Sequence, residues 1–143
     1  MAIKSKKVKL NARERNKFRI RKKAIGSSER PRVTVFKSSK HTYAQAISDL
    51  TGKTLVSAST LEEEVMGEVK KIAATSGKEG DTVARNDLKS SKSVNAARAV
   101  GIVLARRVLE LKVNAVVFDR NGFIYSGRIQ AVADGARAGG LQF

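Results

Sequence analysis

Positively charged side chains are the groups in this sequence most suited to chemistry, and they are concentrated near the N-terminus. Residues 1–30 contain twelve lysines and arginines but only two acidic residues, a net charge of +10, whereas the whole chain of 143 residues carries +16. Such a segment repels itself unless a polyanion neutralises it. Nucleic acid is the first candidate, because lysine and arginine displace the counterions condensed on its phosphates. We therefore predict that residues 1–30 form a basic arm that binds nucleic acid.

Two further segments combine basic side chains with groups that suit RNA. Residues 37–41 read Lys-Ser-Ser-Lys-His, and residues 119–128 read Asp-Arg-Asn-Gly-Phe-Ile-Tyr-Ser-Gly-Arg. Glycine lets a backbone approach a phosphate closely, and arginine can pair with phosphate through two hydrogen bonds. The rings of Tyr43, Phe123 and Tyr125 could stack on unpaired bases or pack in the core. Both segments are therefore candidate RNA contacts.

Residues for metal binding or nucleophilic catalysis are scarce. The chain has one histidine, His41, and no cysteine. It therefore lacks the clusters that hold zinc, and with one histidine and no supporting motif no serine–histidine–aspartate triad can be argued. We expect no cofactor.

A two-metal nuclease is the main alternative function, because the expected order of elements resembles that of ribonuclease H. This chemistry needs clustered carboxylates to hold both ions. The expected first strand, residues 32–37, contains no acidic residue, and Asp119 would stand alone at the end of the fourth. We interpret Asp119 as a structural carboxylate that holds Arg120, Arg128 or N–H groups of its loop, and we expect no enzymatic activity.

The elements that position these side chains can be predicted from sequence patterns. Asn11 can cap a helix that runs to about residue 25, where a glycine would end it. Alternating apolar residues separated by turn signals predict strands at residues 32–37, 42–48 and 54–58. These three strands should form an antiparallel meander.

The second half of the chain predicts more helices and one more strand. The expected elements are a helix at residues 61–73 capped by Ser59 or Thr60, a loop at 74–92, a helix at 94–112 capped by Ser93, a fully buried strand at 115–118, and a helix at 128–137. Because a helix separates the meander from the fourth strand, that strand should join the sheet in parallel.

The predicted fold class is α/β, with a three-stranded antiparallel meander, a parallel fourth strand and packing helices. This arrangement resembles the ribonuclease H-like, translational-machinery-component architecture. Residues 1–30 should form the basic arm with its short helix, and residues 31–143 a single domain with a surface loop at 74–92. No apolar stretch reaches the roughly 18 residues of a membrane span, so we expect no membrane partner.

Several segments together resemble the bacterial large-ribosomal-subunit protein 18 family. The most specific is Val117-Phe118-Asp119-Arg120-x-Gly122-Phe123-x-Tyr125-x-Gly127-Arg128, which continues to the C-terminus as x-x-Ala131-x-Ala133-Asp134-x-Ala136-Arg137-x-Gly139-Gly140-Leu141-x-Phe143. Further matches lie at residues 30–38, 41–47, 57–60 and 95–101. With the basic arm, the resemblance covers nearly the whole chain.

The resemblance implies a structural, non-enzymatic role in the ribosome. Members of that family bind 5S ribosomal RNA and help to attach it to 23S ribosomal RNA at the central protuberance of the large subunit, next to large-subunit protein 5. By the same resemblance we expect a cytoplasmic protein that acts in the large ribosomal subunit and forms no homo-oligomer.

The resemblance also implies which residues contact RNA. The expected contacts are Arg13, Arg15, Lys17, Arg19, Arg21, Lys22 and Lys23 in the arm; Arg30, Arg32, Lys37, Ser38, Ser39, Lys40 and His41 beyond it; Gln45, Ser57, Ser59 and Thr60 in the meander; and Arg120, Tyr125 and Arg128 in the second loop.

Two departures from the family pattern and one alternative remain. Ser126 occupies a position where the family often has histidine, and the loop at residues 74–92 is longer than usual. A protein-interaction module is the alternative, with the apolar residues Leu141 and Phe143 as a docking tail. The competing interpretation is that these two residues pack on the domain.

Overall fold

The structure, a computed structural model, describes residues 9–76 and 93–143. Within these ranges the elements follow in the order α1 (Ala12–Arg21), β1 (Arg32–Lys37), β2 (Thr42–Ser48), β3 (Lys53–Ser59), α2 (Glu63–Ser76), α3 (Val94–Glu110), β4 (Val117–Asp119) and α4 (Arg128–Ala138). The strands form one sheet in the order β3-β2-β1-β4. β1 is antiparallel to β2 and parallel to β4, and β2 is antiparallel to β3. The predicted α/β fold class is confirmed.

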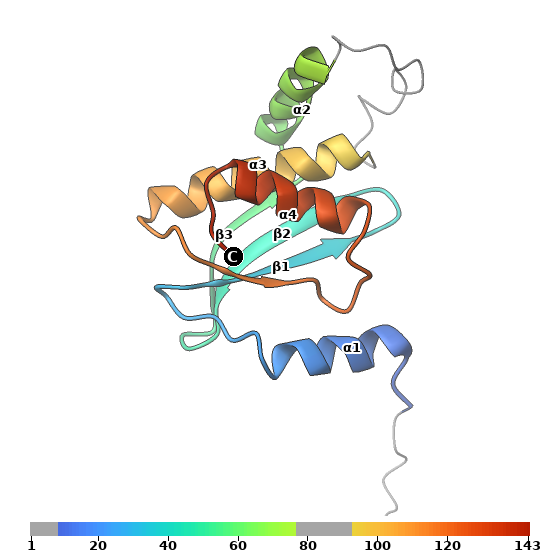
Figure 1. Cartoon of the computed structure of the whole chain (residues 1–143), viewed down its shortest axis with the longest axis vertical. Coiled ribbons are helices and arrows are strands. Elements are labelled where there is room, and N and C mark those ends of the chain that lie inside the picture. Colours follow the sequence, from blue (N-terminus) through green and yellow to red (C-terminus); the bar gives the residue numbers. More distant parts are fainter. Residues whose placement is uncertain (1–8, 77–92) are drawn as a thin grey trace, which may run out of the picture.

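The alternation of side chains along the strands gives the sheet two different faces. Val33 and Val35 of β1 are fully buried, and so are Ala44 and Ala46 of β2. These residues belong to one buried cluster with residues of α3 and α4. The two helices cover one side of the sheet, whereas α1 lies on the other side (Figure 1). The side covered by α1 carries the intervening residues, such as Thr34, and we call it the α1 face.

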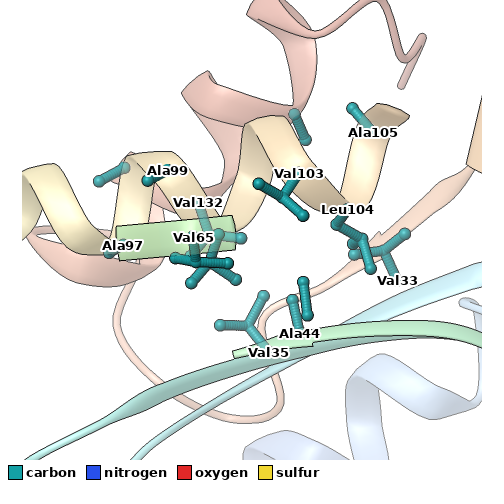
Figure 2. Packing of buried hydrophobic residues seen from close by; sticks show 14 of the residues in the cluster. Val33, Val35, Ala44, Val65, Ala97, Ala99, Val103, Leu104, Ala105 and Val132 are labelled. Carbon is teal, nitrogen blue, oxygen red and sulfur yellow. The ribbon is translucent and has the colours of Figure 1, made fainter. Parts of the chain in front are cut away.

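The hydrophobic core fills the space between the sheet and α3 (Figure 2). Val33, Val35 and Leu104 are fully buried there, and Val65 of α2 and Val132 of α4 complete the cluster. Helix α3 begins at its cap Ser93, whose Oγ accepts a hydrogen bond from the Ala96 N–H at 3.0 Å. A hydroxyl at this position satisfies an N–H group that otherwise lacks a partner in the helix.

Helices α3 and α4 approach each other closely through two glycines. A Cβ atom on Gly101 would collide with the backbone of Val132, and one on Gly135 would collide with the backbone of Arg98. Only glycine therefore permits this crossing distance. Arg107 of α3 pairs with Glu64 of α2 and with Glu62 just before that helix, each at 2.6 Å, which ties α2 to α3.

The C-terminal residues pack against the sheet. Leu141 is 3% exposed, and the ring of Phe143 stacks on that of Phe118 with 5.3 Å between centroids. Ala115 and Gln142 form a parallel bridge next to β4. This confirms the packing interpretation of Leu141 and Phe143, and leaves no free apolar tail for the interaction-module alternative.

Several predicted boundaries were wrong. Helix α1 ends at Arg21 instead of residue 25, because Ala24 turns into the body of the protein and the Gly26 N–H donates to Asp49 Oδ2 at 2.8 Å. Helix α2 begins two residues later than predicted, because the Ser59 N–H donates to the Glu62 carboxylate at 2.9 Å and holds a turn there.

Other differences concern the loop at 74–92 and the fourth strand. Residues 74–76 belong to α2, and the rest of the predicted loop, residues 77–92, lies outside the described residues. Strand β4 covers Val117–Asp119 instead of residues 115–118, and Val117 and Phe118 are only half-buried. In the described part of the chain, no helix is long and apolar enough to cross a membrane.

Candidate nucleic-acid interface

Helix α1 is held together by its cap and not by a core. The Asn11 side chain accepts a hydrogen bond from the Glu14 N–H at 2.9 Å, and the Asn11 N–H donates to the Glu14 carboxylate at 2.8 Å. This reciprocal capping box satisfies two N–H groups at the start of the helix. No residue of α1 is buried. The helix therefore depends on local hydrogen bonds and on a few contacts with the rest of the protein.

Those contacts centre on Arg13. Its guanidinium lies 3.9 Å from the centroid of the Phe123 ring, and its Nε donates to the Asn121 carbonyl at 3.3 Å. Gly122 has φ +77°, and a Cβ atom there would collide with the backbone of Arg13. The Asn121-Gly122 turn therefore forms a seat for the first turn of α1. Arg13, predicted to bind phosphate, is used to dock the helix.

A row of exposed cations follows one side of α1 and ends at its C-cap, Lys22. Arg15, Arg19 and Lys22 are exposed and follow one another at steps of four and three residues, which places them on one side of a helix. In the ranges 9–76 and 93–143, no carboxylate forms an ion pair with any of the three. We call these residues the α1 cationic row. Lys23 is also exposed, and Lys17 is half-buried.

Arg32 takes a different place from the one predicted. Its Nε and Nη2 donate to the two oxygens of Asp49 at 2.9 and 2.7 Å, and its Nη1 donates to Asp119 Oδ2 at 2.9 Å. The side chain is 7% exposed. These hydrogen bonds raise the pKa of Arg32 and lower the pKa of Asp49 to about 2. Two carboxylates thus occupy this guanidinium, and the structure speaks against the predicted phosphate contact.

Asp119 is a structural carboxylate, as its isolation in the sequence indicated. It is fully buried, accepts the Arg32 hydrogen bond, and accepts another from the Asn121 N–H at 2.8 Å. Its predicted loop N–H partner is confirmed, but its arginine partners are Arg32 and, at 3.9 Å, Arg21, and not Arg120 or Arg128. Among the described residues, no three histidine, cysteine, aspartate or glutamate side chains gather into a metal site. The nuclease alternative therefore finds no carboxylate cluster there.

The two candidate RNA loops meet at Arg128. This residue begins α4, and its Nη2 donates to the Ser38 carbonyl at 2.9 Å in the turn between β1 and β2. The same turn is closed by Ser38, whose Oγ accepts from the His41 N–H at 2.9 Å. Ser39 and Lys40 are exposed at its tip, and Lys37 lies half-buried before it. The structure thus brings residues 37–41 and 119–128 to one end of the sheet.

The remaining predicted contacts divide into exposed and occupied side chains. Gln45 and Ser57 are exposed. Arg21, Arg30 and Tyr125 are also exposed but have partners within the protein: Arg21 Nε lies 3.9 Å from Asp119 Oδ2, Arg30 Nε donates to the Val116 carbonyl at 3.4 Å, and the Tyr125 hydroxyl accepts from Arg137 at 3.0 Å. Occupied ones are His41, whose Nδ1 lies 3.2 Å from Thr60 Oγ1; Ser59, whose Oγ accepts from the Leu61 N–H at 3.3 Å; Thr60, which is 3% exposed; and Arg120, which donates to the Phe123 carbonyl. Thr60 is buried against β2, where it accepts from the Thr42 N–H, so it supports the hairpin and does not face a ligand.

Sequence reasoning missed the residues that seat α1. Asn121 and Phe123 form this seat, although their segment was singled out for RNA contact. The Asn-Gly pair was recognisable as a turn signal, since both residues accept positive φ. Nothing in the sequence indicated that a helix more than a hundred residues away would pack on that turn.

Comparison with known proteins identifies relatives over nearly the whole chain. The family model for ribosomal L18 of archaea, bacteria, mitochondria and chloroplasts matches residues 7–91 and 81–143. The large ribosomal subunit protein uL18 of Dictyoglomus thermophilum is 49% identical over 126 residues, which is 88% of each chain. The proteins of the same name from Lachnospira eligens and Sorangium cellulosum are each 45% identical, over 97% and 95% of this chain and 98% of their own. This chain therefore belongs to the ribosomal L18 family.

Proposed function

We propose that this protein is a structural constituent of the large ribosomal subunit, that it binds 5S ribosomal RNA, and that it helps to attach this RNA to 23S ribosomal RNA at the central protuberance. The names of its relatives support the place in the large subunit. A component of this family is structural and not an enzyme. The proposal includes large-subunit protein 5 as a neighbour and the cytoplasm as the location.

The α1 cationic row is the observation that most strongly supports the proposed binding of RNA. Arg15, Arg19 and Lys22 stand on a helix docked to the protein at Arg13, so their charges have a defined position before RNA arrives. Cations gathered on one side of a docked helix can neutralise several phosphates of an RNA backbone at once. A flexible basic tail would supply the same charge without this preorganisation.

Shape selectivity requires a second contact region near the row. The turn at residues 37–41, with exposed Ser39 and Lys40, is joined to the loop before α4 by Arg128. Structured RNA is recognised largely by its shape and by contacts to phosphates and 2′-hydroxyls. Two rigid contact regions at different points on the surface favour one folded RNA over another.

Binding to 5S ribosomal RNA and to transfer RNA, compared across a salt series, tests this proposal. We expect preferential binding to 5S RNA that persists at about 0.15 M salt, with a logarithmic salt dependence that corresponds to several displaced counterions. Equal binding to both RNAs that disappears together with rising salt would contradict the proposal, because it would show only general attraction between charges.

A further inference from the structure

A cleft of about 460 Å³ lies between α1 and the sheet, on the α1 face. Thr34 and Phe36 of β1, Tyr43 and Gln45 of β2, Arg21 of α1, and Asn121 line it. Its volume is within the range of about 300–1,000 Å³ that is usual for small-molecule sites. Arg21 contributes a guanidinium to the lining; its Nε lies 3.9 Å from Asp119 Oδ2, and 43% of its side chain remains exposed.

Two residues that line this cleft each have a buried polar side-chain atom without a partner. These atoms are Thr34 Oγ1 and Asn121 Oδ1, the two such side-chain atoms found in the described residues. Buried polar atoms nearly always have hydrogen-bond partners, so each exception calls for an explanation. Both atoms belong to residues that line the same cleft, which suggests that one ligand satisfies both.

The backbone of Asn121 is fixed in a way that leaves its side chain available. The residue has φ +54°, which is uncommon outside glycine. Its N–H donates to Asp119, and its carbonyl accepts from Arg13. The residue is 7% exposed. Both backbone groups are thus occupied, and the buried side-chain oxygen is left without a partner.

Aromatic rings supply the apolar part of the cleft. The centroids of Phe36 and Tyr43 are 6.1 Å apart, and Phe36 is 43% exposed although it lies within the sheet. A ligand that fits these surroundings is flat, has donors and acceptors on its edge, and carries negative charge near Arg21. An unstacked base of RNA, with its own phosphate, has all these properties.

We propose that this cleft receives one unstacked base of the bound RNA, with its edge on Thr34 and Asn121 and its face towards the rings of Phe36 and Tyr43. The inference rests on the proposed function, since the base belongs to the RNA that the α1 cationic row holds. The row supplies affinity that is independent of sequence, and the cleft adds selectivity for an RNA with an unpaired base at the right place.

The substitution Thr34→Val tests the proposal without changing charge or shape. Replacing an unpartnered buried hydroxyl by a methyl group leaves the stability of the free protein unchanged or higher. If a base forms a hydrogen bond with this hydroxyl, the variant should bind 5S ribosomal RNA about three- to tenfold more weakly than wild type. The slope of the salt dependence should stay the same, because no charge is removed. Thr75→Val, at an exposed position on α2 remote from the cleft, is the matched control and should bind as wild type does.

Crosslinking provides a second measurement. With 5S ribosomal RNA that contains 4-thiouridine, we expect crosslinks in the tryptic peptides that cover residues 33–37, 41–53 and 121–128, and their loss in Thr34→Val. Wild-type affinity in Thr34→Val, or crosslinks confined to α1, would overturn the base-binding cleft while the proposed RNA binding stands. Unchanged binding after neutralisation of Arg15, Arg19 and Lys22 would instead contradict the proposed function itself.

Discussion

Arg32 Nη1 and Asp119 Oδ2 lie 2.9 Å apart and join the first strand of the sheet to the fourth. The Asp119 side chain is completely buried, and the Arg32 side chain is 7% exposed. A buried carboxylate without a partner would be strongly unfavourable, so this pair determines what Asp119 can do. The carboxylate at the end of β4, which the nuclease alternative would have used, is thus neutralised by an arginine on the neighbouring strand.

The first prediction concerns the stability provided by this pair. Arg32→Met removes the arginine that donates a hydrogen bond to a fully buried carboxylate, and the free energy of unfolding should fall by about 3–5 kcal/mol. Arg106→Met is the matched control, because Arg106 pairs with Glu64 and Glu68 but is 46% exposed. The control should lose about 1 kcal/mol or less. Urea unfolding of both variants measures the difference, and equal losses would contradict the structural role of Arg32.

The second prediction concerns acid stability. Arg32 lowers the pKa of Asp49 from an ordinary value of 3.8 to about 2 in the folded protein. Ionised Asp49 therefore stabilises the fold at every pH above its ordinary pKa. This stabilisation decreases as the pH falls below about 5 and is lost near pH 2, with a total on the order of 1–2 kcal/mol.

Asp49→Asn removes this titration. The variant should be less stable than wild type at pH 7, but its free energy of unfolding should fall less between pH 5 and pH 2. Denaturant titrations at several pH values measure both curves. Parallel curves for the two proteins would show that Asp49 has an ordinary pKa.

The third prediction concerns the docking of α1. Gly122→Ala introduces a Cβ atom that collides with the Arg13 backbone, so α1 should leave its seat. The matched control is Gly127→Ala, because Gly127 also has positive φ, at +56°, but has no atom within 4 Å of the added Cβ. Both substitutions should cost about 1–3 kcal/mol in backbone strain.

Hydrogen exchange separates the two effects. The backbone N–H groups of α1 should exchange faster in Gly122→Ala than in Gly127→Ala, while those of α3 should behave alike in both. Equal protection of α1 in the two variants would mean that the Asn121-Gly122 turn does not hold the helix.

Local patterns in the sequence were enough to predict most of the fold. Strands β1 and β2 occupy the predicted residues, and Ser93 caps α3 as expected, because alternation and capping depend on near neighbours. The predicted end of α1 was wrong because the true end does not depend on near neighbours. It depends on a hydrogen bond between Gly26 and Asp49, which belongs to the tertiary structure and leaves no local pattern.

The same distinction applies to the candidate interface. Charge density identified the basic arm, but it could not separate exposed cations from those that support the fold. Arg15 and Arg19 are exposed, whereas Arg13 lies on Phe123, Arg32 is buried between two carboxylates, and Arg128 holds the hairpin turn. Side chains of one type thus have different roles, which depend on neighbours far away in the sequence.

The binding of 5S ribosomal RNA by a variant with Arg15, Arg19 and Lys22 all changed to glutamine tests the central claim most directly. These residues have no ion pair in the described part of the chain and none is buried, so the variant should fold as wild type does. The account predicts an affinity at least tenfold weaker at about 0.15 M salt, and a logarithmic salt slope smaller by about two to three counterions. An unchanged affinity and slope would contradict it, because the α1 cationic row would then not face the RNA.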